Sequence, residues 1–141
     1  RRFKSRIRWY NNDTSKLTLE KKIKTGITNY KVKQSLHKNF FNESLEKNFS
    51  KFDFLPYPTL SNSYLRSYYV IKGFEKIRVT FDTNIQSWHP SRKTKYLFNK
   101  TIIEFKTHID EKRNLKEVIR RMPMKYTKNS KYISGINRVY Y

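Results

Sequence analysis

The chain has 141 residues, with 32 Lys and Arg against 11 Asp and Glu, which gives a formal net charge of +21. So large a charge calls for a polyanion nearby, and nucleic acid, anionic lipid and phosphate chains all qualify. Aromatic residues make up 16% of the chain, far too much for a basic disordered tail. The sequence has no Cys, which excludes a disulfide framework and a cysteine zinc site. It also has no apolar run long enough for a membrane span, and we expect a cytoplasmic location.

Six segments alternate between polar and apolar residues with the period of a half-buried β-strand, and they predict strands at 6–10, 17–24, 29–33, 63–70, 76–85 and 101–108. The NNDTS cluster at 11–15 forms a turn between the first two strands. Gly26 and Gly73 predict hairpins between the second and third strands and between the fourth and fifth. These connections are antiparallel, and the length of the chain suits a single domain over 1–141.

Two segments have helical spacing of apolar residues, 36–50 and 110–121. Asp110 is expected to cap the second helix, and Pro123 lies just past its end. Pro56 and Pro58 mark a loop, so we treat 34–60 as a variable helical or loop insertion. The predicted fold class is therefore α+β, with an antiparallel sheet flanked by helices.

Strand alternation places basic residues on one face of the sheet and apolar residues on the other. The basic face collects Arg6, Arg8, Glu20, Lys22, Lys24, Lys31, Lys33, Tyr64, Arg66, Arg78, Thr80, Asp82, Glu104, Lys106 and His108. One reading is an ordinary antiparallel sheet with a solvated face. The other is a sheet curled into a barrel or tunnel with the charged face inside and the helices outside. A lumen so rich in cations would have to be a binding site, because unneutralised charges are prohibitive there.

Six motifs, in this order along the chain, resemble the VTC (vacuolar transporter chaperone) domain: RIRWYN, LEKKIK, YLRSYY, RVTFD, IIEFKTH and KNSKYISG. This family is the polyphosphate polymerase branch of the triphosphate tunnel metalloenzymes. The resemblance covers nearly the whole chain except 34–60, and it implies an eight-stranded antiparallel tunnel. The family's first strands have no counterpart here, so we expect a fragment truncated at its N-terminus, which can be inactive by itself.

The resemblance also implies roles for single residues. Phosphate binding is implied for Arg6, Arg8, Lys22, Lys31, Lys33, Tyr64, Arg66, Arg78, Lys128, Ser130 and Lys131. Arg66, Arg78 and Lys131 are the residues expected to be catalytic. Glu104 resembles the family's metal-binding glutamate, and Glu20 is either a second metal ligand or a salt-bridge partner. From the residues alone, Asp82 is expected to orient a neighbouring arginine.

The implied activity is transfer of the ATP γ-phosphate to a growing polyphosphate chain, with Mn²⁺ or Mg²⁺ as cofactor. Phosphoryl transfer needs mainly positioning and charge stabilisation, for which arginine offers bidentate contacts and lysine compact charges. A divalent metal on Glu104 would neutralise phosphate oxygens. ATP and polyphosphate are the expected partners, and a membrane subunit is a further candidate.

Three other functions fit parts of the same pattern. A polyphosphate sensor or accessory subunit would use the same tunnel without turnover, and an inorganic triphosphatase would admit water to it. A single-stranded nucleic-acid-binding module also suits the charge and the aromatic content. This last reading is disfavoured because most large apolar side chains lie opposite the basic face, with Tyr64 and Tyr68 as exceptions.

Overall fold

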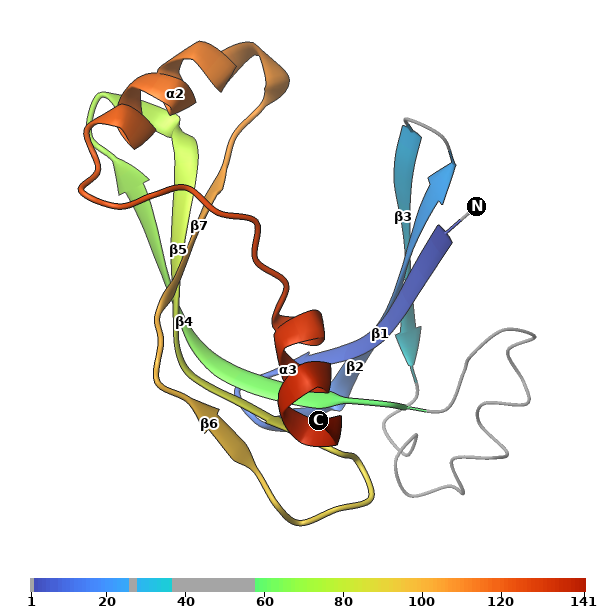
Figure 1. Ribbon diagram of the computed structural model, residues 1–141. Helices are drawn as coiled ribbons and strands as arrows, with labels where there is room; N and C mark the ends of the chain where they lie inside the picture. Colours follow the sequence, from blue (N-terminus) through green and yellow to red (C-terminus); the bar gives the residue numbers. More distant parts are fainter. Residues whose placement is uncertain (1, 26–27, 37–57) are drawn as a thin grey trace. The chain divides into compact units, whose positions relative to one another are not determined.

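The computed structural model describes residues 2–25, 28–36 and 58–141, and the chain divides into two compact units (Figure 1). Unit 1 is Arg1–Tyr57 and unit 2 is Pro58–Tyr141. The single domain over 1–141 stays a prediction. The helix predicted at 36–50 lies outside the described residues, except for Leu36. Residues 34–36 of the predicted insertion belong to a strand instead.

The described part of unit 1 is an antiparallel sheet in the order β1-β2-β3. Its strands are β1 (Arg2–Tyr10), β2 (Asp13–Thr25) and β3 (Thr28–Leu36). Asn11 and Asn12, with φ of 54° and 58°, make the turn between β1 and β2. Two successive residues with positive φ match the right-handed twist of a hairpin. The three strands predicted in this part of the chain are confirmed, and each is longer than expected.

Register places the predicted basic residues of unit 1 on one face, whereas Lys21 shares the opposite face with Leu19 and Ile23. Arg6 lies opposite Glu20, and Glu20 lies opposite Lys33. Two residues further along β2, Lys22 lies opposite Lys4 of β1 and opposite Lys31 of β3. The other face holds the buried side chains Leu17, Leu19 and Ile23. The two-residue period of the sequence therefore decides the faces correctly.

The sheet of unit 2 is built around one long strand, β5 (Phe74–Trp88). It pairs antiparallel with β4 (Ser61–Ile71), β6 (Tyr96–Phe98) and β7 (Ile102–Lys106). Gly73, with φ of 81°, occupies the β4–β5 turn, a conformation that glycine adopts without steric cost. Strands β4, β5 and β7 confirm the predictions. The short strand β6 is absent from them.

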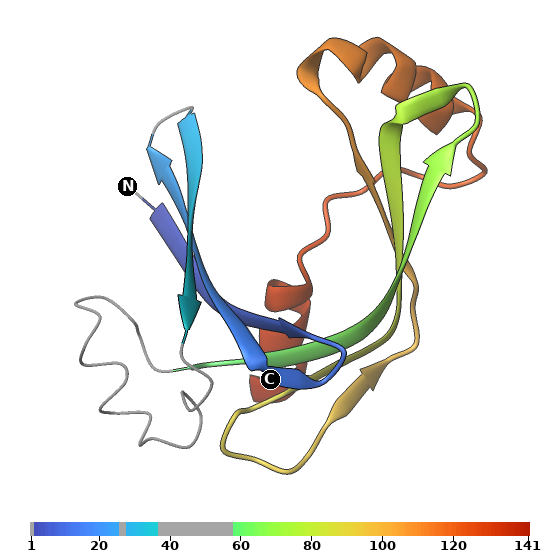
Figure 2. The ribbon, with the colours of Figure 1, turned by 180° about the vertical axis from the view of Figure 1, so that it is seen from behind.

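Three helical segments follow the sheet: η1 (Ile109–Glu111), α2 (Lys112–Arg120) and α3 (Lys131–Tyr140). The predicted helix at 110–121 is confirmed, but the predicted Asp110 cap is wrong. Asp110 lies inside the 3-10 turn, where its carboxylate pairs with His108 at 2.7 Å. Helix α3 was not predicted from the sequence. Figures 1 and 2 show α2 beside the β4–β5 turn and α3 against the other end of the sheet.

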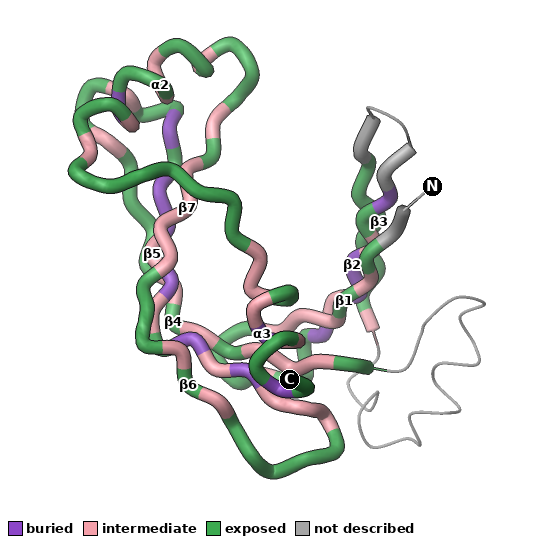
Figure 3. Tube along the Cα trace, viewed as in Figure 1, coloured by how far each residue is buried: buried purple, intermediate pink, exposed green. Residues whose placement is uncertain are grey.

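The buried residues of unit 2 concentrate on β5, as the tube in Figure 3 shows. Ile77, Val79 and Ile85 are the buried apolar residues of this strand, and each helix adds one valine, Val118 in α2 and Val139 in α3. The α+β class with antiparallel sheets is confirmed. In the described ranges the strands form two sheets and no closed barrel, so the tunnel is not confirmed.

Candidate functional site

Strand pairing in unit 2 brings nine residues onto one face of β4, β5 and β7. We call them the grid: Arg66, Tyr68 and Val70 from β4, Asp82, Thr80 and Arg78 from β5, and Ile102, Glu104 and Lys106 from β7. Residues directly opposite each other in an antiparallel pair have neighbouring side chains. Five of the nine carry charge. The grid therefore concentrates charged groups on one side of the sheet.

Asp82 is the most buried charged residue of the grid, with an exposed fraction of 0%. The Arg66 guanidinium donates two hydrogen bonds to it, from Nε to Oδ1 at 2.6 Å and from Nη2 to Oδ2 at 2.7 Å. Lys131, the first residue of α3, pairs with the same carboxylate. Two parallel bonds fix a guanidinium in both position and plane. The prediction that Asp82 orients a neighbouring arginine is confirmed, and the structure adds Lys131.

The protonation states of this cluster follow from its geometry. Burial alone would raise the pKa of Asp82, but its hydrogen bonds with Arg66 and Lys131 outweigh burial and hold the pKa below its ordinary value. The hydrogen bond with Asp82 in turn raises the pKa of Arg66. The cluster thus holds two cations and one carboxylate at neutral pH. Its net positive charge favours an anionic ligand.

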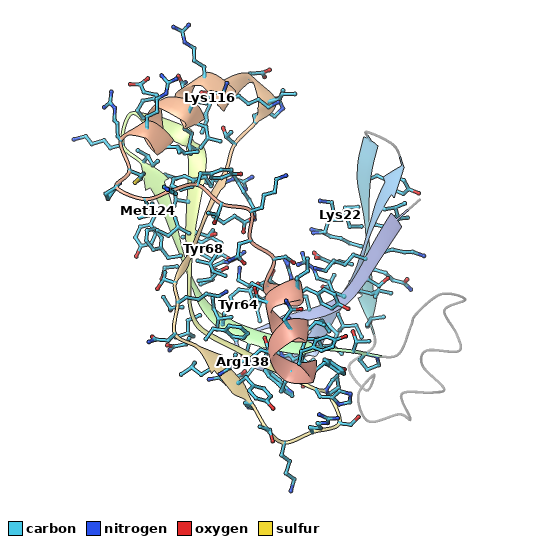
Figure 4. The ribbon with its side chains drawn as sticks, viewed as in Figure 1. Lys22, Tyr64, Tyr68, Lys116, Met124 and Arg138 are labelled. Carbon is cyan, nitrogen blue, oxygen red and sulfur yellow. The ribbon has the colours of Figure 1, made fainter. Side chains whose placement is uncertain are left out.

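Tyr64 lies between the two cations that Asp82 holds. Its ring centroid is 5.2 Å from Arg66 Cζ and 5.0 Å from Lys131 Nζ, within the range of cation–π attraction. Figure 4 shows Tyr64 next to α3, whereas Lys116 lies at the other end of unit 2 on α2. The tyrosine therefore supports the same two side chains as Asp82.

Helix α3 reaches this position through a close approach at Gly135, which is buried. A Cβ at this residue would lie 2.6 Å from Leu60 Cδ2 and 2.8 Å from Ser87 Oγ. A larger residue would require these side chains or the helix to shift. Ser130 begins the helix as its N-cap and accepts a hydrogen bond from the Ile133 N–H at 3.4 Å. Ser130 and Lys131 thus lie at the start of a helix and not in a loop, and the docking of that helix sets Lys131 in place.

Glu104 is the grid carboxylate best suited to a metal ion. Its side chain is 42% exposed, and its contacts are loose: 3.6 Å from Oε2 to Arg66 Nη2 and 3.4 Å from Oε1 to Lys106 Nζ. Among residues 2–25, 28–36 and 58–141, no three His, Cys, Asp or Glu side chains form a group that could hold a metal. Glu104 therefore fits a divalent cation as one ligand, with phosphate and water oxygens supplying the others.

Glu20 in unit 1 is a different kind of carboxylate. It is 4% exposed, and three cations surround it: Arg6 Nη2 at 2.5 Å, Lys31 Nζ at 2.6 Å and Arg8 Nη2 at 3.6 Å. Burial alone would raise its pKa, but the hydrogen bonds from Lys31 and Arg6 hold it below the ordinary value. Its oxygens are fully used by cations. The structure therefore favours Glu20 as the salt-bridge partner rather than the metal ligand.

The structure gathers the predicted phosphate-binding residues by unit. Unit 1 presents Arg6, Arg8, Lys22, Lys31 and Lys33 on one face, and unit 2 places Tyr64, Arg66, Arg78 and Lys131 on or beside the grid, with Ser130 at the start of α3. The predicted metal ligand Glu104 also belongs to the grid. Lys128 is exposed in the segment before α3. In the described part of the chain, Lys22, Lys33, Arg78 and Lys128 take part in no ion pair. Their charges are available to a ligand.

Two site residues, Lys4 and Gly135, escaped the sequence prediction, and Thr80 was placed on the basic face without a role. Lys4 extends the basic face of unit 1, opposite Lys22, and desolvation, followed by the charges of Arg6 and Lys22, lowers its pKa. Thr80 occupies the centre of the grid, and Gly135 docks α3. Lys4 could have been found by the strand period, which places it on the basic face with Arg6 and Arg8. Gly135 gave no such signal, because an internal glycine lowers helix propensity.

Comparison with known proteins gives one match: a family model described as VTC domain covers residues 55–140. These residues include every strand and helix of unit 2. No match was found among curated proteins or among solved structures. No helix in the described ranges has both the length and the hydropathy to cross a membrane.

Proposed function

The chain belongs to the VTC domain family, and on this premise we propose that it binds ATP and polyphosphate and transfers the ATP γ-phosphoryl group to the polyphosphate end. The family points to a polyphosphate-related domain. The observation that carries the finer proposal is the Arg66–Asp82–Lys131 cluster, in which a buried carboxylate holds two cations on the same face as Arg78, which takes part in no ion pair among the described residues.

The cluster suits phosphate because its cations are positioned before a ligand arrives. Asp82 uses the Nε and Nη2 groups of Arg66 and leaves Nη1 available. A preorganised guanidinium stabilises the charge on the peripheral oxygens of a transferring phosphoryl group without reorganising. Arg78 is exposed and adds a mobile cation on the same face.

The reaction needs few groups from the protein. A terminal oxygen of the polyphosphate chain forms a bond to the γ-phosphorus of ATP, the bond to the β–γ bridging oxygen breaks, and ADP leaves. Arg66, Arg78 and Lys131 would hold the charged oxygens in line. Mn²⁺ or Mg²⁺ on Glu104 would supply Lewis-acid neutralisation of phosphate oxygens. The tunnel implied by the family resemblance stays part of this proposal.

Binding is tested by titrating the full-length protein with tripolyphosphate in a calorimeter. Arg78→Ala removes a grid cation that takes part in no described ion pair, so it should weaken binding about tenfold or more with little effect on folding. Lys116→Ala removes an exposed cation from α2 and is the matched control. Equal losses in the two variants would indicate a diffuse electrostatic surface instead of a site.

Turnover is tested with ATP and Mn²⁺, with Mg²⁺ in parallel, scoring long-chain polyphosphate, ADP and free phosphate. The proposal expects polyphosphate with ADP, and the loss of both in Glu104→Gln. Free phosphate alone would indicate a triphosphatase, and tight polyphosphate binding without turnover would indicate a sensor. Preference for single-stranded nucleic acid would overturn the proposal.

A further inference from the structure

The centre of the grid is a threonine whose hydroxyl has no partner. Thr80 is 4% exposed, and its Oγ1 is buried and makes no hydrogen bond within the described residues. A buried hydroxyl without a hydrogen bond destabilises the folded protein, because it has lost its water and gained nothing in return. Such a group therefore calls for an explanation.

The neighbours of Thr80 do not use its hydroxyl, although two of them could. Glu104 lies directly opposite in register, but its oxygens face Arg66 and Lys106. Asp82, two residues along the same strand, is occupied by Arg66 and Lys131. Asp82 is committed to its two cations, and the looser contacts of Glu104 also turn toward cations, so neither carboxylate accepts a hydrogen bond from Thr80 in the described part of the chain.

The side chains beside Thr80 can also give way. Tyr68 lies opposite it on β4 with an exposed fraction of 69%, and Arg78 is exposed two residues along β5. Neither has an ion pair or ring contact among the residues that the structure describes. Exposed side chains change rotamer within nanoseconds. A ligand drawn in by the grid cations can therefore reach the hydroxyl.

We infer that the Thr80 hydroxyl binds the ligand, donating a hydrogen bond to a phosphate oxygen that Arg66 and Arg78 hold over the centre of the grid. This inference rests on the proposed function and adds a neutral hydrogen-bond donor to it. Because a hydrogen bond is directional, this donor favours a phosphate oxygen in one position, whereas a cation attracts any nearby anion. Position supports it, because Thr80 lies between Arg78 and Asp82 along its strand and between Tyr68 and Glu104 across the sheet.

The test replaces Thr80 with Val, which keeps nearly the same shape and removes only the hydroxyl. Tripolyphosphate binding to the full-length protein should weaken about tenfold, the loss expected for a hydrogen bond to a charged group. The Tm of the ligand-free protein should stay the same or rise, since an unpaired buried hydroxyl is removed. If the hydroxyl served only the folded structure, Thr80→Val would lower the Tm and leave tripolyphosphate binding unchanged.

Two further variants complete the design. Thr80→Ser keeps the hydroxyl and should restore binding. Thr107→Val removes another buried hydroxyl without a partner, one that lies outside the grid, and should leave binding unchanged. Wild-type affinity in Thr80→Val, with binding still lost in Arg78→Ala, would overturn this inference and leave the proposed function standing. No binding by the wild-type protein would overturn both.

Discussion

The two units place cations around a buried carboxylate in different ways. Each has one buried carboxylate among cations on a basic face, Glu20 in unit 1 and Asp82 in unit 2. All the partners of Glu20 come from its own sheet, from β1 and β3. One partner of Asp82 comes from a helix that docks against its sheet. Strand pairing alone can place cations around a carboxylate, but only packing can bring one from outside the sheet.

The exposure of the partners also differs. The Arg6 and Lys31 side chains around Glu20 are 46% and 40% exposed, whereas Arg66 and Lys131 around Asp82 are 18% and 19% exposed. Water screens the first set more strongly than the second. The two clusters should therefore contribute unequally to stability. The chain offers a reporter for each unit, because Trp9 lies in unit 1 and Trp88 in unit 2.

The largest effect is expected from Asp82→Asn. The substitution leaves Lys131 without its buried counter-charge and Arg66 with only the looser contact to Glu104, which should lower the free energy of unfolding of unit 2 by about 2 to 4 kcal/mol. Urea denaturation followed by Trp88 fluorescence, in a Trp9→Phe background, measures it. If Asp82→Asn lowers the free energy of unfolding no more than breaking the exposed Arg121–Glu117 pair does, the cluster is well solvated and this prediction is wrong.

A somewhat smaller effect is expected from Gly135→Ala. The added Cβ meets the ends of the Leu60 and Ser87 side chains, so these side chains or α3 must shift, at a cost of about 1 to 3 kcal/mol. Tripolyphosphate affinity should fall as well, because Lys131 moves with the helix. Asn137→Ala, at an exposed position of the same helix, is the control. Unchanged affinity in Gly135→Ala would mean that the position of Lys131 does not matter for binding.

Glu20→Gln should have a weaker effect than Asp82→Asn. Its two nearest cations, Arg6 and Lys31, are nearly half-exposed, so the loss in unit 1 should be about 1 kcal/mol. Denaturation followed by Trp9 fluorescence, in a Trp88→Phe background, measures it. An effect equal to that of Asp82→Asn would remove the distinction between the two clusters.

The smallest expected effect is the loss, at acid pH, of the stability that Asp82 contributes. Because the folded pKa of Asp82 lies below the ordinary 3.8, its ion pairs add stability that is present above pH 3.8 and is lost as the pH falls through the lowered pKa. The difference in Tm between wild type and Asp82→Asn, followed at Trp88, should therefore be constant near neutral pH and shrink below pH 3.8. A difference that stays constant into strong acid would show that Asp82 acts through its shape and not through its charge.

The sequence by itself determined the strands and their faces. Alternation in RIRWY and RVTFD placed Arg6, Arg8, Arg78 and Asp82 on the basic face, because a two-residue period admits only two assignments and burial selects one. The VTC resemblance was likewise readable from the motifs. The resemblance also points to Arg66 and Glu104, which strand register places on the grid, and to Tyr64, whose ring centroid lies 5.2 Å from Arg66 Cζ.

Only the tertiary structure decided which charges meet. Asp82 and Lys131 are 49 positions apart in the sequence, and no local pattern links them. Their contact depends on the close packing of Gly135 against Leu60 and Ser87. The unpartnered hydroxyl of Thr80 is likewise invisible in sequence, because a missing hydrogen bond is a property of all the surrounding side chains together.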